Sequence, residues 1–213
     1  MKTKFAAAAA VSTLAILALL FAAGPMYAQE KPAPAPSSAA QPAPAFKVDR
    51  NHSTIGFEVP IMGGLSKVPG KFTDFDVAVV YDEADVARSS VNATIRVASI
   101  DTGIADRDKD LRSAGFFDVD KFPTITFASQ SIEKKDATHF VAHGTLTMKG
   151  VAKPIDLSVT YAGEFQLPNN GKKIIGFHAS TKLNRRDYGI TWEHQALATF
   201  VGDDVEVVID IIN

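Results

Sequence analysis

The sequence predicts an all-β protein: an antiparallel barrel of about eight strands with one short helical insert. Apolar and polar residues alternate with period two over most of the chain after residue 53, as in strands with one buried face. Turn sequences such as Lys149-Gly150 and Asn169-Asn170-Gly171 separate the alternating runs. A long antiparallel meander removes its unpaired edges by closing on itself, so we expect a barrel rather than an open sheet.

The first 45 residues are predicted to lie outside the barrel. Residues 1–28 have the pattern of a secretory signal peptide, with Lys2 and Lys4 before an apolar run and a small residue at the end. The apolar run is about long enough to span a bilayer, so a retained membrane anchor is the alternative. Residues 29–45 are rich in proline and alanine and predict an extended linker. Residues 46–213 remain for one folded domain.

Composition narrows the function classes. The formal net charge is −2, without the basic excess of a nucleic-acid-binding domain, so we expect no nucleic-acid partner. The chain has no cysteine, so an exported protein with this sequence is stabilised by packing rather than by disulfides.

Alternation places the strands of the first half. They are predicted at residues 46–49, 54–59, 65–75, 77–81 and 91–97. Gly63-Gly64 ends the second strand, and Pro69 indicates that the third is an edge or a bent strand. The alternation is clearest in the fifth, where Val91, Ala93 and Ile95 share one face.

The stretch from Asp101 to Ser129 breaks the alternation. Asp106–Arg112 is charged and lacks β-branched residues, which predicts a short helix that ends near Gly115. Adjacent Phe116 and Phe117 follow, and we expect one to pack on the barrel while the other guards its mouth. Such an insert usually covers an edge or closes an end of a sheet.

Alternation resumes after the insert and continues to the C-terminus. Further strands are predicted around residues 124–127, 140–148, 151–161, 175–183 and 205–211. In the strand predicted at residues 151–161, which follows the Lys149-Gly150 turn, the side chains of Ile155, Leu157, Val159 and Tyr161 are predicted to point inward. Small residues at positions predicted to look inward favour a void over a filled core; they are Gly56, Ala93, Ala142, Gly144 and Ala179.

Four segments carry a family resemblance. They are Val48-Asp49 with 52–57, Asp110–Ser113 with 116–119 and 122–127, Gly144–Pro154, and Asn184–Ile190. In this order they strongly resemble the YceI-like family of exported bacterial proteins, and the resemblance covers residues 46–213. Two positions depart mildly from the family pattern: Tyr188 stands where phenylalanine is common, and Lys149 where histidine is common.

The resemblance implies a lipocalin-like barrel with an elongated apolar cavity. It implies a cargo such as a polyisoprenoid, an isoprenoid quinone or a fatty-acid-like lipid, and no established catalytic activity. The predicted lining residues are Phe57, Phe75, Val91, Ile95, Phe116, Phe117, Ile125, Phe127, Leu146, Phe177 and Trp192. The alternative for each of them is that it only fills the core.

A head group would need hydrogen-bond donors. Arg112, Asn184 and Arg185 are the candidates, because arginine forks match phosphate oxygens. The alternative is that Arg112 pairs with Asp118 or Asp120, and that Arg185 or Arg186 pairs with Asp187.

Neither a metal site nor a catalytic site is predicted. His139 and His143 lie on a predicted strand, where four residues span about 13 Å, too far to share one ion. The sequence contains no Gly-x-Ser-x-Gly elbow and no cysteine nucleophile.

The sequence therefore predicts a periplasmic or secreted binding protein rather than an enzyme. It would hold a long apolar amphiphile in the barrel for carriage or sequestration, with no cofactor other than such a bound isoprenoid lipid or quinone. An enzyme acting on such a lipid and a packed structural or stress protein are the alternatives. Transient membrane contact and a homodimer stay open.

Overall fold

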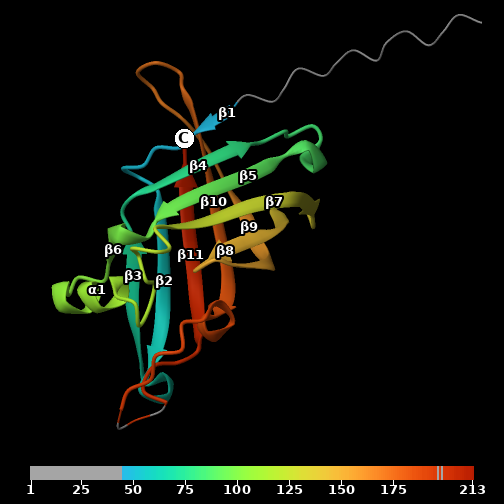
Figure 1. The fold of residues 1–213 in the computed structure, drawn as a ribbon. Coiled ribbons are helices and arrows are strands. Elements are labelled where there is room, and N and C mark those ends of the chain that lie inside the picture. The colour runs from blue at the N-terminus through green and yellow to red at the C-terminus, as the bar shows by residue number, and fades with distance from the viewer. Residues whose placement is uncertain (1–44, 196, 198) are drawn as a thin grey trace, which may run out of the picture. The chain divides into compact units, whose positions relative to one another are not determined.

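A computed structural model describes residues 45–195, 197 and 199–213. Over these residues the chain forms eleven strands and one α-helix, joined by turns and short 3-10 helices (Figure 1). The strands are β1 (Ala45–Lys47), β2 (Thr54–Ile61), β3 (Ser66–Phe72), β4 (Phe75–Val80), β5 (Ser90–Arg96), β6 (Ile100–Asp101), β7 (Thr124–Lys134), β8 (His139–Met148), β9 (Val151–Gln166), β10 (Lys173–Asn184) and β11 (Asp204–Ile212). The helix is α1 (Ala105–Arg112), and the 3-10 helices are η1 (Met62–Gly64), η2 (Val86–Arg88), η3 (Val97–Ser99) and η4 (Arg185–Tyr188).

The strands form one antiparallel sheet that curls into a barrel. Its order is β1-β4-β5-β7-β8-β9-β10-β11-β2-β3-β6. The segment from Ser90 to Asp101 joins the two sides, because β5 pairs with β4 and β7 while β6 pairs with β3. The predicted antiparallel barrel is confirmed, but about eight strands was too few. Strand β1 was predicted as residues 46–49, whereas β6 was not predicted, because its two paired residues are too few for an alternation to show in the sequence.

The alternation decides which side chains enter the barrel. Along β8, Phe140, Ala142, Gly144, Leu146 and Met148 are buried, and the residues between them are half-buried. Phe127 of β7 lies opposite Leu146, and its ring lies over Gly144, where an added Cβ would be 2.4 Å from the ring. The glycine thus lets the ring pack flat against the neighbouring strand.

The predicted helical insert is present as α1, one residue longer at its start. Buried Asp108 accepts hydrogen bonds from the backbone N–H of Thr102 (2.9 Å) and its hydroxyl (2.6 Å). Arg112 donates to the carbonyls of Ala98 (2.8 Å) and Ile100 (2.7 Å). These contacts fasten the helix to η3, β6 and the turn that follows, so the insert covers the place where the barrel closes.

One predicted strand was wrong, and one predicted orientation was confirmed. The stretch 65–75 is not one bent strand: β3 ends at Phe72 and β4 starts at Phe75. Tyr161 points inward as predicted, because it pairs with Phe177, whose side chain lines the cavity. It packs on Tyr81 and Phe177, with ring centroids 6.1 and 5.6 Å away.

The N-terminal predictions are not tested. The predicted signal peptide, residues 1–28, lies outside the described residues, and so does the predicted linker except for Ala45, which begins β1. Within the part of the chain that the structure describes, no helix is long and apolar enough to cross a membrane.

Candidate functional site: an apolar cavity in the barrel

The barrel encloses a cavity of about 900 Å³. Its wall is formed mainly by aliphatic and phenylalanine side chains from β2, β4, β5 and β7–β11. Most of these strands supply every second residue, as in the run Val205, Val207, Ile209 and Ile211 of β11. The period-two pattern therefore creates the wall directly, since alternate side chains of a strand point to the same face.

All the predicted lining residues except Phe75 line this cavity. Those that do are Phe57, Val91, Ile95, Phe116, Phe117, Ile125, Phe127, Leu146, Phe177 and Trp192. Phe75 is 2 % exposed and packs in the core at the start of β4, with the guanidinium of Arg50 5.8 Å from its ring centroid. Whether the lining residues contact a ligand stays a prediction.

Small residues help to keep the interior open. Gly56, Ala93, Ala142 and Ala179 are part of the lining. Gly144 is not, because the ring of Phe127 lies over it. Gly70 acts in the same way for Phe57, since a Cβ at this glycine would lie 2.3 Å from that ring. Two phenylalanine rings are thus seated against the wall.

The insert forms one end of the cavity. Phe116 stacks on Trp192 with ring centroids 5.2 Å apart, and Phe117 meets Phe72 of β3 edge to face at 6.2 Å. Asp110, Ser113 and Gly115 also line the cavity and are exposed, so the cavity reaches the surface beside α1. One aromatic residue packs on the barrel and the other on the loop residue Trp192; a gating movement stays a prediction.

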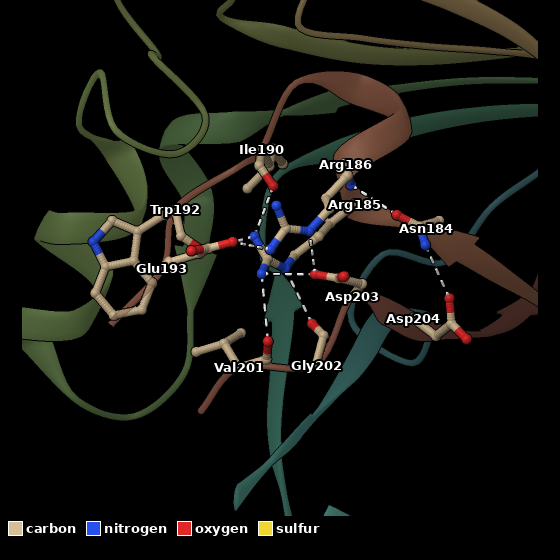
Figure 2. Close-up of polar contacts among 10 residues, drawn as sticks. All are labelled: Asn184, Arg185, Arg186, Ile190, Trp192, Glu193, Val201, Gly202, Asp203 and Asp204. Atoms are coloured by element: carbon tan, nitrogen blue, oxygen red, sulfur yellow. Dashed lines mark hydrogen bonds and ion pairs between the residues drawn. The ribbon is translucent and has the colours of Figure 1, made fainter. Parts of the chain in front are cut away.

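Arg185 lies at the edge of the cavity and is only 5 % exposed. Its five N–H groups are directed at five protein oxygens, which belong to Gly202, Ile190, Trp192, Val201 and Asp203 (Figure 2). Burial lowers the pKa of Arg185, while the neighbouring Asp203 carboxylate works against this effect. A guanidinium has five donors, so none is left for a head group. Arg185 instead holds residues 190–192 and 201–203 together.

The other two head-group candidates are also engaged. Arg112 binds backbone carbonyls, as described above, rather than Asp118 or Asp120. Asn184 caps η4 by accepting from the N–H of Arg186 (3.0 Å) and donates to Asp204 (3.3 Å).

The predicted pairing of Arg185 or Arg186 with Asp187 was wrong. Arg186 pairs with Asp203 (2.7 Å) and Glu193 (2.6 Å), which raises its pKa, and Asp187 pairs with Lys153 (3.0 Å). These partners are up to 34 residues apart in sequence, so only the fold brings them together.

The histidines lie away from the cavity wall. His143 projects from β8 between Asp156 (2.7 Å) and Glu133 (3.2 Å), and these two carboxylates, Asp156 foremost, raise its pKa. No group of three metal-ligating side chains occurs in the described parts of the chain. Phe200 and Val201, which line the cavity, were missed in the sequence because they lie in a segment without alternation.

Fold and cavity together place the protein among antiparallel barrels with an apolar interior. The chain belongs to the YceI-like family, since the family model described as YceI-like domain matches residues 46–212. This confirms the resemblance seen in the sequence motifs.

Relatives and solved structures agree with this assignment. The chain is 41 % identical to a UPF0312 protein of Enterobacter sp. (strain 638) over 148 residues, which are 68 % of this chain and 76 % of that protein. The Campylobacter jejuni YceI crystal structure has a TM-score of 0.62 and 30 % identity, with 70 % of this chain and 85 % of that chain covered. A polyisoprenoid binding domain from Saccharophagus degradans, implicated in plant cell wall breakdown, has a TM-score of 0.56 at 14 % identity and covers 78 % of this chain and 96 % of its own. At this identity the last match shows the fold alone.

Proposed function

We propose that this protein is an exported carrier that binds a long apolar amphiphile in its barrel. The cargo is a polyisoprenoid, an isoprenoid quinone or a fatty-acid-like lipid, held for carriage or sequestration in the periplasm or outside the cell. The single observation that carries the proposal is the apolar cavity of about 900 Å³. Cavities of several hundred Å³ that are mostly apolar are typical of small-molecule sites.

The driving force is the burial of apolar surface. Removal of apolar area from water contributes about 25 cal/mol per Å², so a chain-like molecule needs few polar contacts to bind. The fold shared with a polyisoprenoid binding domain supports an isoprenoid as cargo.

The composition of the wall favours binding over catalysis. The charged residues that line the cavity within the described chain are Arg107, Asp110 and Arg185. Arg185 has no donor left, and Arg107 donates to the hydroxyl and the carbonyl of Thr102 at 2.8 Å each. No histidine, cysteine or lysine is among these lining residues, and the hydroxyl of the lining Ser113 donates to the backbone carbonyl of Asp110 at 2.6 Å. The volume of the cavity favours the carrier over a packed barrel.

An exposed apolar tip supports transient contact with a membrane. Met62 is 51 % exposed, Leu65 is 87 % exposed and Leu197 is 55 % exposed. Their neighbours Ile61 and Val201, which form a bridge, line the cavity. We propose that this tip touches the bilayer surface while the cargo is exchanged. Large apolar side chains exposed to water are unfavourable, and a group of them is typical of a surface that contacts a membrane or another protein.

Native mass spectrometry tests the carrier function. The exported protein is purified from the periplasm without detergent, and what it carries is extracted and identified. We expect one isoprenoid, quinone or acyl lipid per chain. A protein that is empty and that also takes up none of these lipids in titration would reject the proposal.

A further inference from the structure

Arg107 places a positive charge on a cavity wall that is mainly apolar. The residue belongs to the first turn of α1, lines the central cavity and is half-buried. It lies on the same short helix as Asp110, which is exposed and lines the cavity where it reaches the surface. The cation is therefore at an open end of the cavity, between the apolar interior and water.

Two hydrogen bonds fix the guanidinium of Arg107. Its Nε donates to the hydroxyl of Thr102, and its Nη2 donates to the carbonyl of the same residue, each at 2.8 Å. The hydroxyl of Thr102 in turn donates to the carboxylate of Asp108 at 2.6 Å, and Asp108 is only 7 % exposed. The guanidinium is thus held in one orientation before any ligand binds, which lowers the entropic cost of binding.

The other N–H groups of Arg107 are unused. A guanidinium has five donors, and the two bonds to Thr102 are the hydrogen bonds that Arg107 makes within the described chain. None of the described carboxylates forms an ion pair with it. In the described residues, buried side-chain polar atoms without a partner occur at Arg96 and Tyr188 but not at Arg107, so its unpaired Nη1 is accessible to solvent.

The other charged residues of the wall do not replace Arg107. Arg185 directs all five of its donors at protein oxygens. Asp110 adds a negative charge near Arg107, but its side chain is exposed, and water and salt screen such a charge. Among the described lining residues, Arg107 is therefore the cation that still has donors for a ligand.

We propose that Arg107 binds the anionic oxygens of a head group, a carboxylate or a phosphate, while the apolar tail of the same molecule lies in the central cavity. The forked N–H groups of arginine match both kinds of oxygen. Because Arg107 and the apolar residues line one continuous cavity, a single amphiphile reaches both.

This inference rests on the proposed carrier function and names the head-group residue of that site. It replaces the three residues that the sequence suggested. Arg112 and Asn184 do not line the cavity, and Arg185 has no donor left.

The test compares three probes with the same fourteen-carbon chain: myristic acid, tetradecyl phosphate and 1-tetradecanol. Each displaces the fluorescent apolar probe N-phenylnaphthylamine from the wild-type protein and from Arg107→Gln. We expect Arg107→Gln to bind one or both anionic probes at least about tenfold more weakly, as for the loss of a hydrogen bond between charged groups, and to bind 1-tetradecanol with nearly the wild-type affinity. The anion with the larger loss identifies the head group as a carboxylate or a phosphate.

Asp110→Asn should have the opposite effect. Removal of an exposed negative charge near Arg107 should strengthen the binding of the anionic probes by roughly twofold to fivefold. Lys109→Gln is the matched control, because it removes one positive charge from the same helix at an exposed position that does not line the cavity. It should leave all three affinities unchanged.

Equal losses for all three probes in Arg107→Gln would show that Arg107 only supports the shape of the insert, and the head-group site would be wrong. The same conclusion would follow if Arg107→Gln bound both anions as tightly as the wild type, or if Lys109→Gln weakened them as much. In these cases the carrier function stands. If the wild type binds none of the three probes, the carrier function fails and the head-group site with it.

Discussion

Arg185 shows how one buried residue orders the loops at the end of the barrel. Its five donors meet four backbone carbonyls and the carboxylate of Asp203. We expect Arg185→Ala to lower the free energy of unfolding by about 3 kcal/mol, because buried carbonyls lose their partners. Urea unfolding measures the change.

Arg186→Ala is the control for this prediction. Arg186 makes two ion pairs, but its side chain is 35 % exposed, and exposed pairs contribute about 0–1 kcal/mol. Equal losses for the two variants would show that the carbonyl contacts of Arg185 do not stabilise the fold.

His143 provides a prediction of pH dependence. The carboxylates of Asp156 and Glu133 raise the pKa of His143 above its usual 6.5, so the folded state binds a proton more tightly than the unfolded state. The resulting stabilisation is fully present below pH 6.5 and is lost as the pH rises through the raised pKa.

His143→Gln should therefore reduce stability at pH 6 and have less effect at higher pH. Urea midpoints of both proteins over a pH series measure this difference. A difference between them that grows with pH would contradict the assignment.

Between strands β7 and β8, Gly144 leaves the space that the ring of Phe127 occupies. A Cβ at this position would lie 2.4 Å from the ring of Phe127 and 2.6 Å from the carbonyl oxygen of Ala128. We expect Gly144→Ala to destabilise the protein by about 1–3 kcal/mol, because backbone has to shift as well as the ring. Thermal unfolding measures the loss.

Gly115→Ala is the matched control for Gly144→Ala. Its nearest atoms would be 3.7 and 3.9 Å from the new Cβ, which is ordinary contact. Similar losses of stability at both glycines would mean that the close approach at Gly144 is unimportant.

The apolar tip formed by Met62, Leu65 and Leu197 is the proposed membrane-contact surface. Leu65→Ser should slow the uptake of farnesol from phosphatidylglycerol vesicles several-fold and leave its affinity in solution unchanged, since Leu65 is not part of the cavity wall. Phe165→Ser is the control: Phe165 is 62 % exposed and lies near the β9–β10 turn, at the other end of the barrel (Figure 1). Equal slowing by both variants would argue against the tip.

The sequence predicted those features that depend on local pattern. Alternation identified the long strands and most of the cavity wall, because every second side chain of a strand points to the same face and the buried face is therefore apolar. The helix α1 was found from its composition, since a charged run without β-branched residues disfavours a strand.

Features that depend on distant pairings were not predicted. The partners of Arg185 come from residues 190–203, and the pairing of β9 with β10 ends midway, at Ser180/Ser158. The register shift between β9 and β10 at Gly176/Phe177 is likewise not visible in the alternation of either strand. Such irregularities follow from how strands meet, and no single strand encodes them.

At the scale of the whole molecule, the proposed function requires that the interior of the barrel holds an apolar ligand. Titration with N-phenylnaphthylamine of the wild type, of Ala179→Phe and of Ala128→Phe tests this claim. Ala179 lies on the cavity wall, whereas Ala128 is exposed on the outer face of β7. We expect the wild type and Ala128→Phe to bind one probe per chain equally well, and the cavity-filling Ala179→Phe to bind at least about tenfold more weakly while its unfolding transition stays cooperative. Undiminished binding by a folded Ala179→Phe would contradict the claim and would place the ligand elsewhere on the protein.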